Sequence, residues 1–330
     1  MLWQDKTILV TGAAGFIGSH LVELLLKYGS KVKAFVHYNS RSDIGNLRFL
    51  PKEAFDRIEV IFGDVRDSGS VDRAVSGCEC VFHLAALIGI PYSYLAPRSY
   101  VDTNVNGSLN VLEAVHRQRI PRMIHTSTSE VYGTAQYEPI DENHPLQGQS
   151  PYSASKIGAD MLVESYYRSF GLAATILRPF NTYGPRQSAR AVIPTIISQL
   201  LSGKEFVRLG SLEPERDLTF VEDTARAFVA AAESEEMLGK TVHIGNGKSI
   251  SIGKLAEMLV EMINPNAQIV CDEKRVRPLK SEVMKLICDY SKAESDMEWK
   301  PTVSLTEGLG RTIEFVRQQT DHYNTDNYAV

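Results

Sequence analysis

The segment Thr7-Ile8-Leu9-Val10-Thr11-Gly12-Ala13-Ala14-Gly15-Phe16-Ile17-Gly18 decides the fold that this chain of 330 residues adopts. Its apolar start predicts a buried strand, and the apolar residues that recur at helical spacing after position 16 predict a helix. Three glycines lie between the two elements as Gly-x-x-Gly-x-x-Gly. In such a unit the glycines permit a tight turn, close approach of a pyrophosphate, and close packing of helix on strand. The segment therefore predicts a dinucleotide site with the anion on the helix N-terminus, formed by Gly12, Gly15, Phe16, Ile17 and Gly18.

Outward from this unit, β-branched runs alternate with helical patterns, which is typical of a parallel sheet with crossover helices. The predicted strands cover residues 7–10, 31–36, 58–62, 80–84, 123–126 and 174–177. From residue 181 the rhythm changes, and helices are predicted near residues 193–201, 223–233, 252–262 and 305–318. We expect an α/β fold with a Rossmann-type, doubly wound parallel sheet in residues 1–180. A smaller C-terminal domain is expected in residues 181–330, with part of 218–245 returning to the sheet.

Composition limits the possible partners. The net charge of −5 argues against nucleic acid, which needs a concentrated basic face. The first residues lack the pattern of a signal peptide, and no apolar run approaches the roughly 20 residues that span a bilayer. The four cysteines match no zinc spacing, and the eight histidines form no His-x-x-x-His pair. We therefore expect a cytoplasmic protein without a metal site, a membrane partner or a nucleic-acid partner.

Three further strand ends bear on the dinucleotide. Gly63-Asp64-Val65 ends the third strand with a carboxylate suited to an adenine amino group. Leu84-Ala85-Ala86 ends the fourth with small residues, where the backbone must pass a cofactor. The second strand ends in Val36-His37-Tyr38-Asn39-Ser40-Arg41, without the acid that often holds a ribose 2′-hydroxyl. Because His37 and Arg41 could accept a 2′-phosphate there, both NAD and NADP stay open.

Tyr152-Ser153-Ala154-Ser155-Lys156 suits proton transfer. Residues four apart share one helix face, so the ammonium can lie beside the phenol and the cofactor ribose. A neighbouring cation favours the phenolate and lowers the tyrosine pKa from about 10. The phenolate can then take a proton from a hydroxyl whose carbon loses hydride. The fifth strand leads into Thr128-Ser129-Glu130, which places hydroxyls and a carboxylate at the edge where open α/β sheets bind ligands.

These motifs, with Asn104-Val105-Asn106-Gly107 and residues 178–185, resemble the extended short-chain dehydrogenase/reductase family of nucleotide-sugar epimerases, dehydratases and decarboxylases. The resemblance covers nearly the whole chain. It implies a tightly bound, recycled NAD(P), with a preference for NAD, and a smaller domain that binds the sugar nucleotide. It also implies a homodimer through helices around residues 101–115 and 155–169. Thr128 would assist Tyr152, and Asn104 would belong to the cofactor site. The residues that it assigns to the sugar nucleotide are Asn181, Arg186, Arg190, Arg216 and Arg277, the last two on the diphosphate.

Ser129 and Glu130 bear on which reaction the chain catalyses. In the 4,6-dehydratases that this strand end resembles, a base at the place of Glu130 takes the C5 proton after oxidation at C4. The 4-epimerases lack a carboxylate there. Dehydratases of dTDP-glucose usually have Thr-Asp-Glu, whereas Thr-Ser-Glu resembles GDP-mannose dehydratases. In those enzymes the glutamate would also protonate the leaving hydroxyl, with help from the serine or a water.

The leading hypothesis is an NAD(P)-dependent nucleotide-sugar 4,6-dehydratase. Residues 87–94 and 181–194 resemble bacterial 4,6-dehydratases of nucleotide-linked N-acetylglucosamine from legionaminic-acid-type pathways, so UDP- or GDP-N-acetylglucosamine is the expected substrate. A 4-epimerase and a UDP-glucuronate decarboxylase, which also has Thr-Ser-Glu, are alternatives. A noncatalytic dinucleotide-binding scaffold is a fourth, disfavoured by the presence of Thr128, Tyr152 and Lys156.

Overall fold

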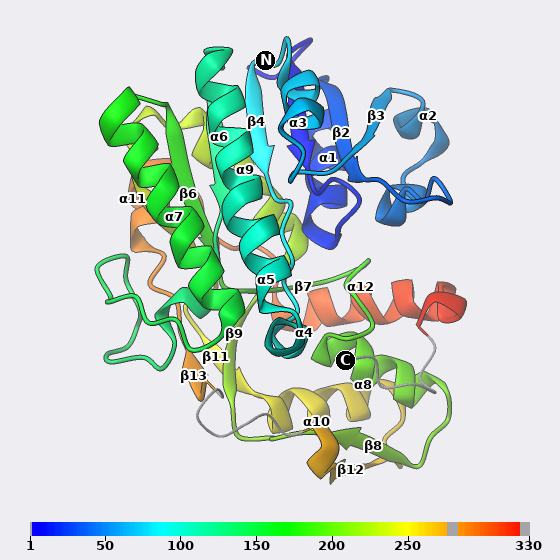
Figure 1. Ribbon diagram of the computed structural model, residues 1–330. Helices are drawn as coiled ribbons and strands as arrows, with labels where there is room; N and C mark the ends of the chain where they lie inside the picture. Colours follow the sequence, from blue (N-terminus) through cyan, green and yellow to red (C-terminus); the bar gives the residue numbers. More distant parts are fainter. Residues whose placement is uncertain (1, 276–282, 324–330) are drawn as a thin grey trace.

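The computed structural model describes residues 2–275 and 283–323, and its centre is a seven-stranded parallel sheet (Figure 1). The strand order is β3-β2-β1-β4-β5-β6-β10. The chain first adds β2 and β3 on one side of β1 and then adds β4 and the later strands on the other side, as in doubly wound folds. All six predicted strands are present, and the Rossmann-type α/β fold is confirmed. The strands are β1 (Thr7–Thr11), β2 (Lys31–His37), β3 (Ile58–Gly63), β4 (Cys80–His83), β5 (Met123–Thr126), β6 (Ala174–Pro179) and β10 (Thr241–Ile244).

Helices cover both faces of this sheet because successive strand residues point to opposite sides. Ile8 and Val10 belong to one buried cluster, whereas Leu9 between them belongs to the other. The first face carries α1 (Phe16–Lys27), α9 (Val221–Glu233) and α11 (Ser291–Met297). The second carries α3 (Ser68–Val75), α6 (Gly107–Arg117) and α7 (Pro151–Phe170), which lie in front of the sheet in Figure 1.

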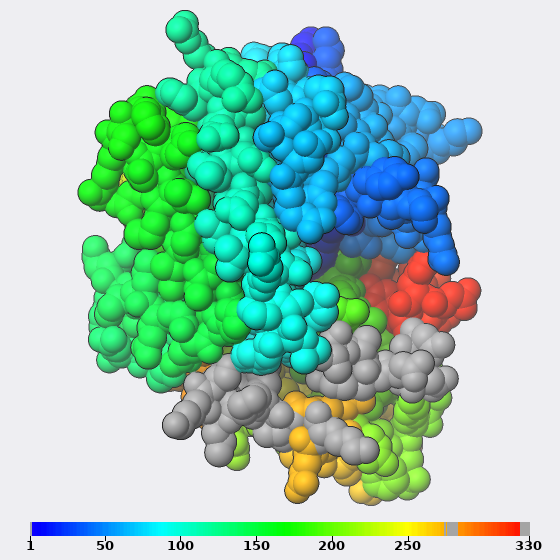
Figure 2. All heavy atoms as spheres, viewed as in Figure 1, coloured from blue at the N-terminus to red at the C-terminus, as the bar shows by residue number. Residues whose placement is uncertain are grey.

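The chain leaves the large sheet after β6 and comes back to it. β10 pairs in parallel with β6, with Thr241 opposite Ile176, and α9 packs against α1. Part of the segment 218–245 therefore lies in the large sheet, and the smaller lobe is an excursion from it. Figure 2 shows the surface receding between the blue N-terminal segments and the smaller lobe below them.

The smaller lobe combines short strands with three amphipathic helices. β9 (Glu215–Phe220) is its central strand and pairs with β7 (Asn181–Tyr183), β11 (Ser249–Ser251) and β13 (Lys285–Leu286). A separate pair joins β8 (Phe206–Leu209) and β12 (Gln268–Cys271). The helices α8 (Val192–Leu201), α10 (Ile252–Ile263) and α12 (Leu305–Gln318) bury their apolar faces on one cluster. These three helices and α9 match the four predicted in this half of the chain.

Within residues 2–275 and 283–323, no helix is both long and apolar enough to cross a bilayer. In the same part of the chain, no group of three or more His, Cys, Asp or Glu side chains is arranged to hold a metal ion. The four cysteines are free thiols, and Cys78, Cys80 and Cys288 are buried. Burial raises the pKa of the Cys78 thiol to about 11, which leaves it protonated at neutral pH.

Asp217 ties the smaller lobe to the return of the chain. Its buried carboxylate accepts backbone N–H groups of Asn246 (2.6 Å), Gly247 (2.8 Å) and Cys288 (3.0 Å).

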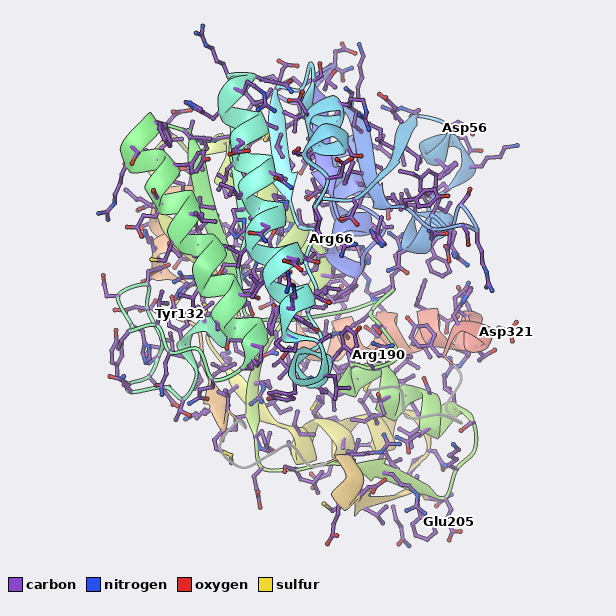
Figure 3. The ribbon with its side chains drawn as sticks, viewed as in Figure 1. Asp56, Arg66, Tyr132, Arg190, Glu205 and Asp321 are labelled. Carbon is purple, nitrogen blue, oxygen red and sulfur yellow. The ribbon has the colours of Figure 1, made fainter. Side chains whose placement is uncertain are left out.

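Asp217→Ala leaves three N–H groups without an acceptor, so we expect the free energy of unfolding, measured by urea titration, to fall by about 3 kcal/mol or more. The exposed Asp56, at the edge of the molecule in Figure 3, offers a control, since Asp56→Ala should change stability by less than about 0.5 kcal/mol. Equal losses in both variants would contradict the role given to Asp217.

Candidate active site

The glycine loop lies where β1 ends, against the end of β4. Gly12 has φ of +68°, and a Cβ there would lie 2.8 Å from the backbone nitrogen of Ala85. A Cβ at Gly18 would lie 2.2 Å from the carbonyl oxygen of Gly12. Glycine is therefore required at both positions. Gly15 is the N-cap of α1 and provides no side-chain acceptor, so the first N–H groups of the helix, from Phe16 and Ile17 onward, are available to an anion.

A hydrogen-bonded cluster beneath the loop, which the sequence did not predict, joins β1 to β4. The Thr11 hydroxyl accepts the backbone N–H groups of Leu84 and Ala85, each at 3.1 Å. Its own hydrogen therefore goes to His83 Nδ1 at 2.8 Å, and His83 Nε2 donates to Ser108 Oγ at 3.0 Å. Burial lowers the pKa of His83 well below its usual value, so the ring is neutral. This cluster holds the predicted segment of Leu84, Ala85 and Ala86 beside the glycine loop.

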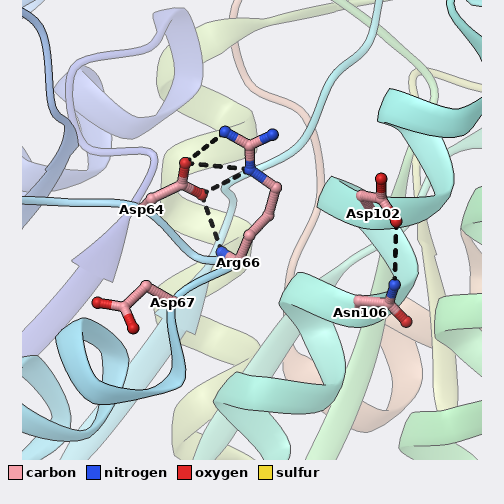
Figure 4. A pocket seen from close by; sticks show the side chains of 5 residues that line it. All are labelled: Asp64, Arg66, Asp67, Asp102 and Asn106. Carbon is pink, nitrogen blue, oxygen red and sulfur yellow. Dashed lines mark hydrogen bonds and ion pairs between the residues drawn. The ribbon is translucent and has the colours of Figure 1, made fainter.

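The predicted adenine side lies at the end of β3. Asp64 lines a cavity of about 460 Å³ together with Arg66, Asp67, Asp102 and Asn106 (Figure 4). Arg66 donates to Asp64 from Nε at 3.0 Å and from Nη2 at 2.6 Å, and these hydrogen bonds hold the pKa of Asp64 below its ordinary value. An adenine amino group would thus share an ionised carboxylate with Arg66.

Val65, the residue after Asp64, is buried beside this cavity. Val65 is 7% exposed and packs under Gly107, where a Cβ would lie 2.9 Å from Val65 Cγ2. Its carbonyl oxygen accepts Asn110 Nδ2 at 2.8 Å. Val65 therefore supports the cavity from below, and its backbone fixes the position of α6.

The end of β2 carries the residues predicted near the ribose. The His37 side chain is 73% exposed, with Nδ1 3.9 Å from Asp64 Oδ2. Asn39 Oδ1 accepts the N–H groups of Arg41 (3.1 Å) and Asp43 (2.8 Å), which fixes the loop that follows. Asp43 is the acid of this loop, and it pairs with Arg48. The structure thus places His37 and Arg41 at this edge of the sheet, while the carboxylate of Asp43 is paired with Arg48.

Tyr152 and Lys156 lie on the buried face of α7. Tyr152 is hydrogen-bonded to the Thr128 side chain, and its ring centroid lies 6.2 Å from that of Tyr100. Lys156 Nζ donates to the carbonyl oxygen of Thr126 at 2.6 Å, which anchors the ammonium at the end of β5. Burial lowers the pKa of Lys156 to about 8 and raises the pKa of Tyr152. The predicted pair is therefore assembled on one helix face, with Thr128 across from the phenol.

The segment after β5 presents alternate side chains to the site. Thr128 caps the short helix η3 (Ser129–Tyr132) by accepting the N–H of Glu130 at 3.2 Å. Thr128 and Glu130 are partly exposed, whereas Ser129 between them is only 2% exposed. The charge of Glu130 is close enough to Tyr152 to oppose its ionisation. Thr128, Glu130, Tyr152 and Lys156 thus come together, while Ser129 has little access to a ligand.

The side chain of Asn104 is held by hydrogen bonds within the protein, and its predicted place in the cofactor site stays a prediction. It lies in η2 (Val101–Asn106), a π-helical stretch between α5 (Pro97–Tyr100) and α6, where the sequence predicted one regular helix. Its fully buried amide accepts from Leu87 N (2.8 Å) and donates to Leu87 O (3.0 Å) and Ser155 Oγ (2.9 Å). With the Oδ1 acceptor engaged and both N–H groups donated, the side chain joins the loop after β4 to α7 and lies one layer behind the site.

The residues expected to hold the sugar nucleotide come from several segments after β6. Asn181 is the first residue of β7, and its Oδ1 is buried without a hydrogen-bond partner in the part of the chain that the structure describes. Arg190 is exposed (Figure 3). Burial raises the pKa of Tyr100, and the positive charge of Arg190 acts in the opposite direction. Arg216 is buried on β9, with Nη1 donating to Glu215 O at 2.9 Å. Arg277 lies outside the described residues.

Arg186 is directed toward the cofactor helix. It adopts a left-handed φ of +69°, and its guanidinium donates to Glu23 of α1 at 2.7 Å. His20 of α1 lies 2.9 Å from Pro185 O, and Asn46 Nδ2 donates to Arg186 O at 3.1 Å. The loop after β7 is therefore fastened to α1. Arg186 Nε and Nη1 are buried without a hydrogen-bond partner among the described residues, so the expected contact with the sugar nucleotide stays a prediction.

Comparisons with known proteins agree with this site. The family model for GDP-mannose 4,6 dehydratase matches residues 9–312. A dTDP-glucose 4,6-dehydratase of Actinoplanes sp. is 33% identical over 94% of this chain and 97% of its own. The structure of DesIV, a dTDP-glucose 4,6-dehydratase of Streptomyces venezuelae with NAD and TYD bound, is 30% identical, with a TM-score of 0.84 over 96% of this chain and 98% of that one.

An epimerase is equally similar. The UDP-glucuronic acid 4-epimerase of Bacillus cereus, solved with UDP-glucuronic acid and NAD, is 30% identical, with a TM-score of 0.85 over 95% of this chain and 99% of that one. Dehydratases and epimerases thus match at similar identity, and both of these solved neighbours hold NAD. The glycine loop, the Tyr152–Lys156 pair and these matches along nearly the whole chain lead to one conclusion: the chain belongs to the short-chain dehydrogenase/reductase-type nucleotide-sugar epimerase/dehydratase family.

Proposed function

We propose that this member of the family is a 4,6-dehydratase of UDP- or GDP-N-acetylglucosamine that retains NAD through each cycle. The observation that carries the proposal is Glu130, a partly exposed carboxylate beside the hydrogen-bonded pair of Thr128 and Tyr152. A 4-epimerase needs hydride transfer and a ketone that rotates, but no base at this place. A dehydratase needs such a base for the C5 proton.

The proposed steps use the side chains in sequence. Tyr152, held by Thr128 and favoured as phenolate by the charge of Lys156, takes the proton of the C4 hydroxyl. A bound nicotinamide would supply the hydride acceptor and later the hydride donor. Glu130 takes the C5 proton, which the C4 ketone has made acidic, and returns a proton to the C6 hydroxyl so that it leaves as water. Hydride then enters at C6, a proton from solvent enters at C5, and Tyr152 releases to solvent the proton that it took from the C4 hydroxyl, so the product differs from the substrate by one water.

The proposal of NAD rests on the solved neighbours that hold it. The chain's own residues suit a dinucleotide: the uncapped start of α1 for the pyrophosphate, and Asp64 for the adenine amino group. The buried, unpartnered Asn181 Oδ1 would accept a donor from the sugar nucleotide.

We also propose a homodimer. The helices expected to form it, η2 with α6 and α7, carry the exposed apolar side chains Val101, Met161, Tyr167 and Phe170. Light scattering on the purified protein would give twice the monomer mass, and a monomer mass would reject the proposal.

Gly18→Ala is expected to weaken cofactor retention at least about tenfold, which corresponds to about 1.4 kcal/mol. The new Cβ would press on the carbonyl oxygen of Gly12 and move the loop that should receive the pyrophosphate. Nicotinamide released from denatured protein measures retention. Gly310→Ala is the matched control, since a Cβ at Gly310 meets nothing within 4 Å. Full retention in Gly18→Ala would refute the assignment of this loop to the cofactor.

The test of function is incubation of purified protein with UDP- and GDP-N-acetylglucosamine, without added cofactor, followed by mass spectrometry of the product. Loss of one water from one substrate supports the dehydratase and identifies its nucleotide. An unchanged mass with a changed C4 configuration by NMR indicates the 4-epimerase. Loss of carbon dioxide from UDP-glucuronate indicates the decarboxylase, and no change in any of the three indicates a scaffold.

A further inference from the structure

A second charged residue of α7 lies one helical turn beyond Lys156. Asp160 is fully buried, and a spacing of four places it on the same helix face as Lys156. Isolated charges are rare inside proteins because transfer from water costs far more than folding usually supplies. A buried carboxylate on the same helix face as a buried ammonium therefore needs a physical explanation.

The contacts of Asp160 fix its carboxylate firmly. Ser127 Oγ donates to Oδ2 at 2.6 Å, and Arg178 donates to the same oxygen from Nε at 3.2 Å and Nη2 at 2.9 Å. His125 Nε2 lies 3.4 Å from Oδ1. These groups come from β5, the turn after it and β6, so three neighbouring segments hold one carboxylate in place beneath the proposed active site.

Arg178 is itself held from its far side. Its Nη1 donates to the hydroxyl of Tyr132 at 2.5 Å, and that hydroxyl lies 2.5 Å from His243 Nε2. The Tyr132 hydroxyl accepts from Arg178, so it donates its own hydrogen to His243 Nε2. His243 Nδ1 therefore carries the ring hydrogen and donates it to Ile140 O at 3.2 Å. Arg178 is thereby aimed at Asp160, and Tyr132 (labelled in Figure 3) closes the network at the outer edge of the sheet.

The histidines in this network do not contribute charge at neutral pH. Burial lowers the pKa of His125 to about 4 and that of His243 to about 3, and it lowers the pKa of His83 well below its usual value. The charges that remain around Asp160 are the cations Lys156 and Arg178, with the carboxylate of Glu130 on the side of Tyr152. One buried anion therefore serves two buried cations.

We infer that Asp160 is a positioning residue that, oriented by Arg178, keeps the ammonium of Lys156 in its charged form; the inference rests on the role proposed above for Lys156. Lys156 donates to the carbonyl of Thr126, so Asp160 acts through its charge. Asp160 does not contact the reacting atoms. Its effect reaches Tyr152 by way of the lysine.

The pKa shifts of Lys156 and Asp160 have the directions that this geometry predicts. Burial lowers the pKa of Lys156 and the charge of Asp160 raises it, with a net value of about 8. Burial raises the pKa of Asp160, but the His125 contact and the charges of Arg178 and Lys156 bring it to about 2. Removing the carboxylate therefore lowers the pKa of Lys156 further, and the ammonium is lost as pH rises through the physiological range.

Asp160→Asn should lower the pKa of Lys156 by at least about one pH unit, the usual effect of an opposite charge nearby. NMR of protein labelled with ¹³C at lysine Cε measures this pKa without turnover, with the signal assigned by its absence from Lys156→Arg. If the protein turns over a nucleotide sugar, the alkaline limb of its pH–rate profile should move down by the same amount. Glu164→Gln, an acid-to-amide change one turn further along α7 at a partly exposed position paired with Arg168, should leave the pKa of Lys156 unchanged.

An unchanged Lys156 pKa in Asp160→Asn would overturn the inference. If that variant fails to fold because Arg178 is left unpaired, Asp160→Asn is combined with Arg178→Gln, and the pKa of Lys156 must be lower in this double variant than in Arg178→Gln alone, because the two differ only in the carboxylate. If Asp160→Asn lowers the pKa of Lys156 as expected but the unmodified protein turns over no nucleotide sugar, the proposed function is rejected and the role of Asp160 is kept. The two failures are therefore distinguishable.

Discussion

Tyr152→Phe is expected to lower turnover by about 10²- to 10⁴-fold, the contribution of a positioned acid or base, while leaving the bound cofactor in place. The ring can keep its contact with Tyr100, because the substitution removes only the hydroxyl that bonds Thr128. Without that oxygen, no group on α7 can take the proton of the sugar hydroxyl as hydride leaves. The glycine loop and the Asp64 cavity lie on other elements, so the cofactor should stay bound.

Single-turnover mixing of variant and nucleotide sugar, with absorbance of reduced nicotinamide as the signal, measures this loss at the hydride step. Tyr166→Phe is the matched control, since it removes a phenol hydroxyl from a partly exposed position on the same helix. Turnover within tenfold of the unmodified protein would show that Tyr152 is not the acid–base group. Loss of cofactor together with turnover would instead show that the phenol supports binding.

The large sheet was predictable because its signals are local. Most of its strands are short apolar runs, several of them ending in glycine or small residues, and its helices show clear periodicity. The strands of the smaller lobe were not predicted, since β7, β11 and β13 are two to three residues long. What makes them strands is their pairing with β9, which brings together segments far apart in the sequence.

The site residues divide in a similar way. Residue type indicated Tyr152, Lys156 and Glu130, but it could not show where a side chain points. Arg186 faces Glu23 because of its left-handed φ, and Asn104 faces Leu87 because of a π-helical turn. Their conformations follow from tertiary contacts, which leave no pattern in a single sequence.

Two residues were missed although the sequence carries a weak signal for each. Thr11 is a hydroxyl at the end of an otherwise apolar strand, and Asp160 is an acid on the face of α7 that the apolar pattern assigns to the core. A polar residue at an interior position requires a buried partner. The partners, His83 for Thr11 and Arg178 for Asp160, come from other strands and become visible only in the folded chain.

Glu130→Gln is expected to lower dehydration by about 10²- to 10⁴-fold while leaving oxidation at C4 intact, because the amide keeps the size of the side chain and cannot take the C5 proton. Tyr152, Lys156 and Thr128 remain in place for the first proton and hydride transfer. The variant should therefore build up reduced nicotinamide when it is mixed with the nucleotide sugar, whereas a functioning dehydratase would return the hydride to C6 within each cycle. Glu113→Gln on the exposed face of α6 is the control and should behave as the unmodified protein.

Solvent deuterium separates this outcome from the other reactions of the family. In deuterium oxide the unmodified dehydratase would place deuterium at C5 of its product, because the carbon loses its own proton to Glu130 and is reprotonated. A 4-epimerase never breaks the C5–H bond, so its product would carry no deuterium there, and Glu130→Gln would not stop it. Reduced nicotinamide without a product therefore assigns Glu130 to the C5 proton. Undiminished turnover in Glu130→Gln would remove the observation on which the dehydratase proposal rests and leave the epimerase as the activity that this site supports.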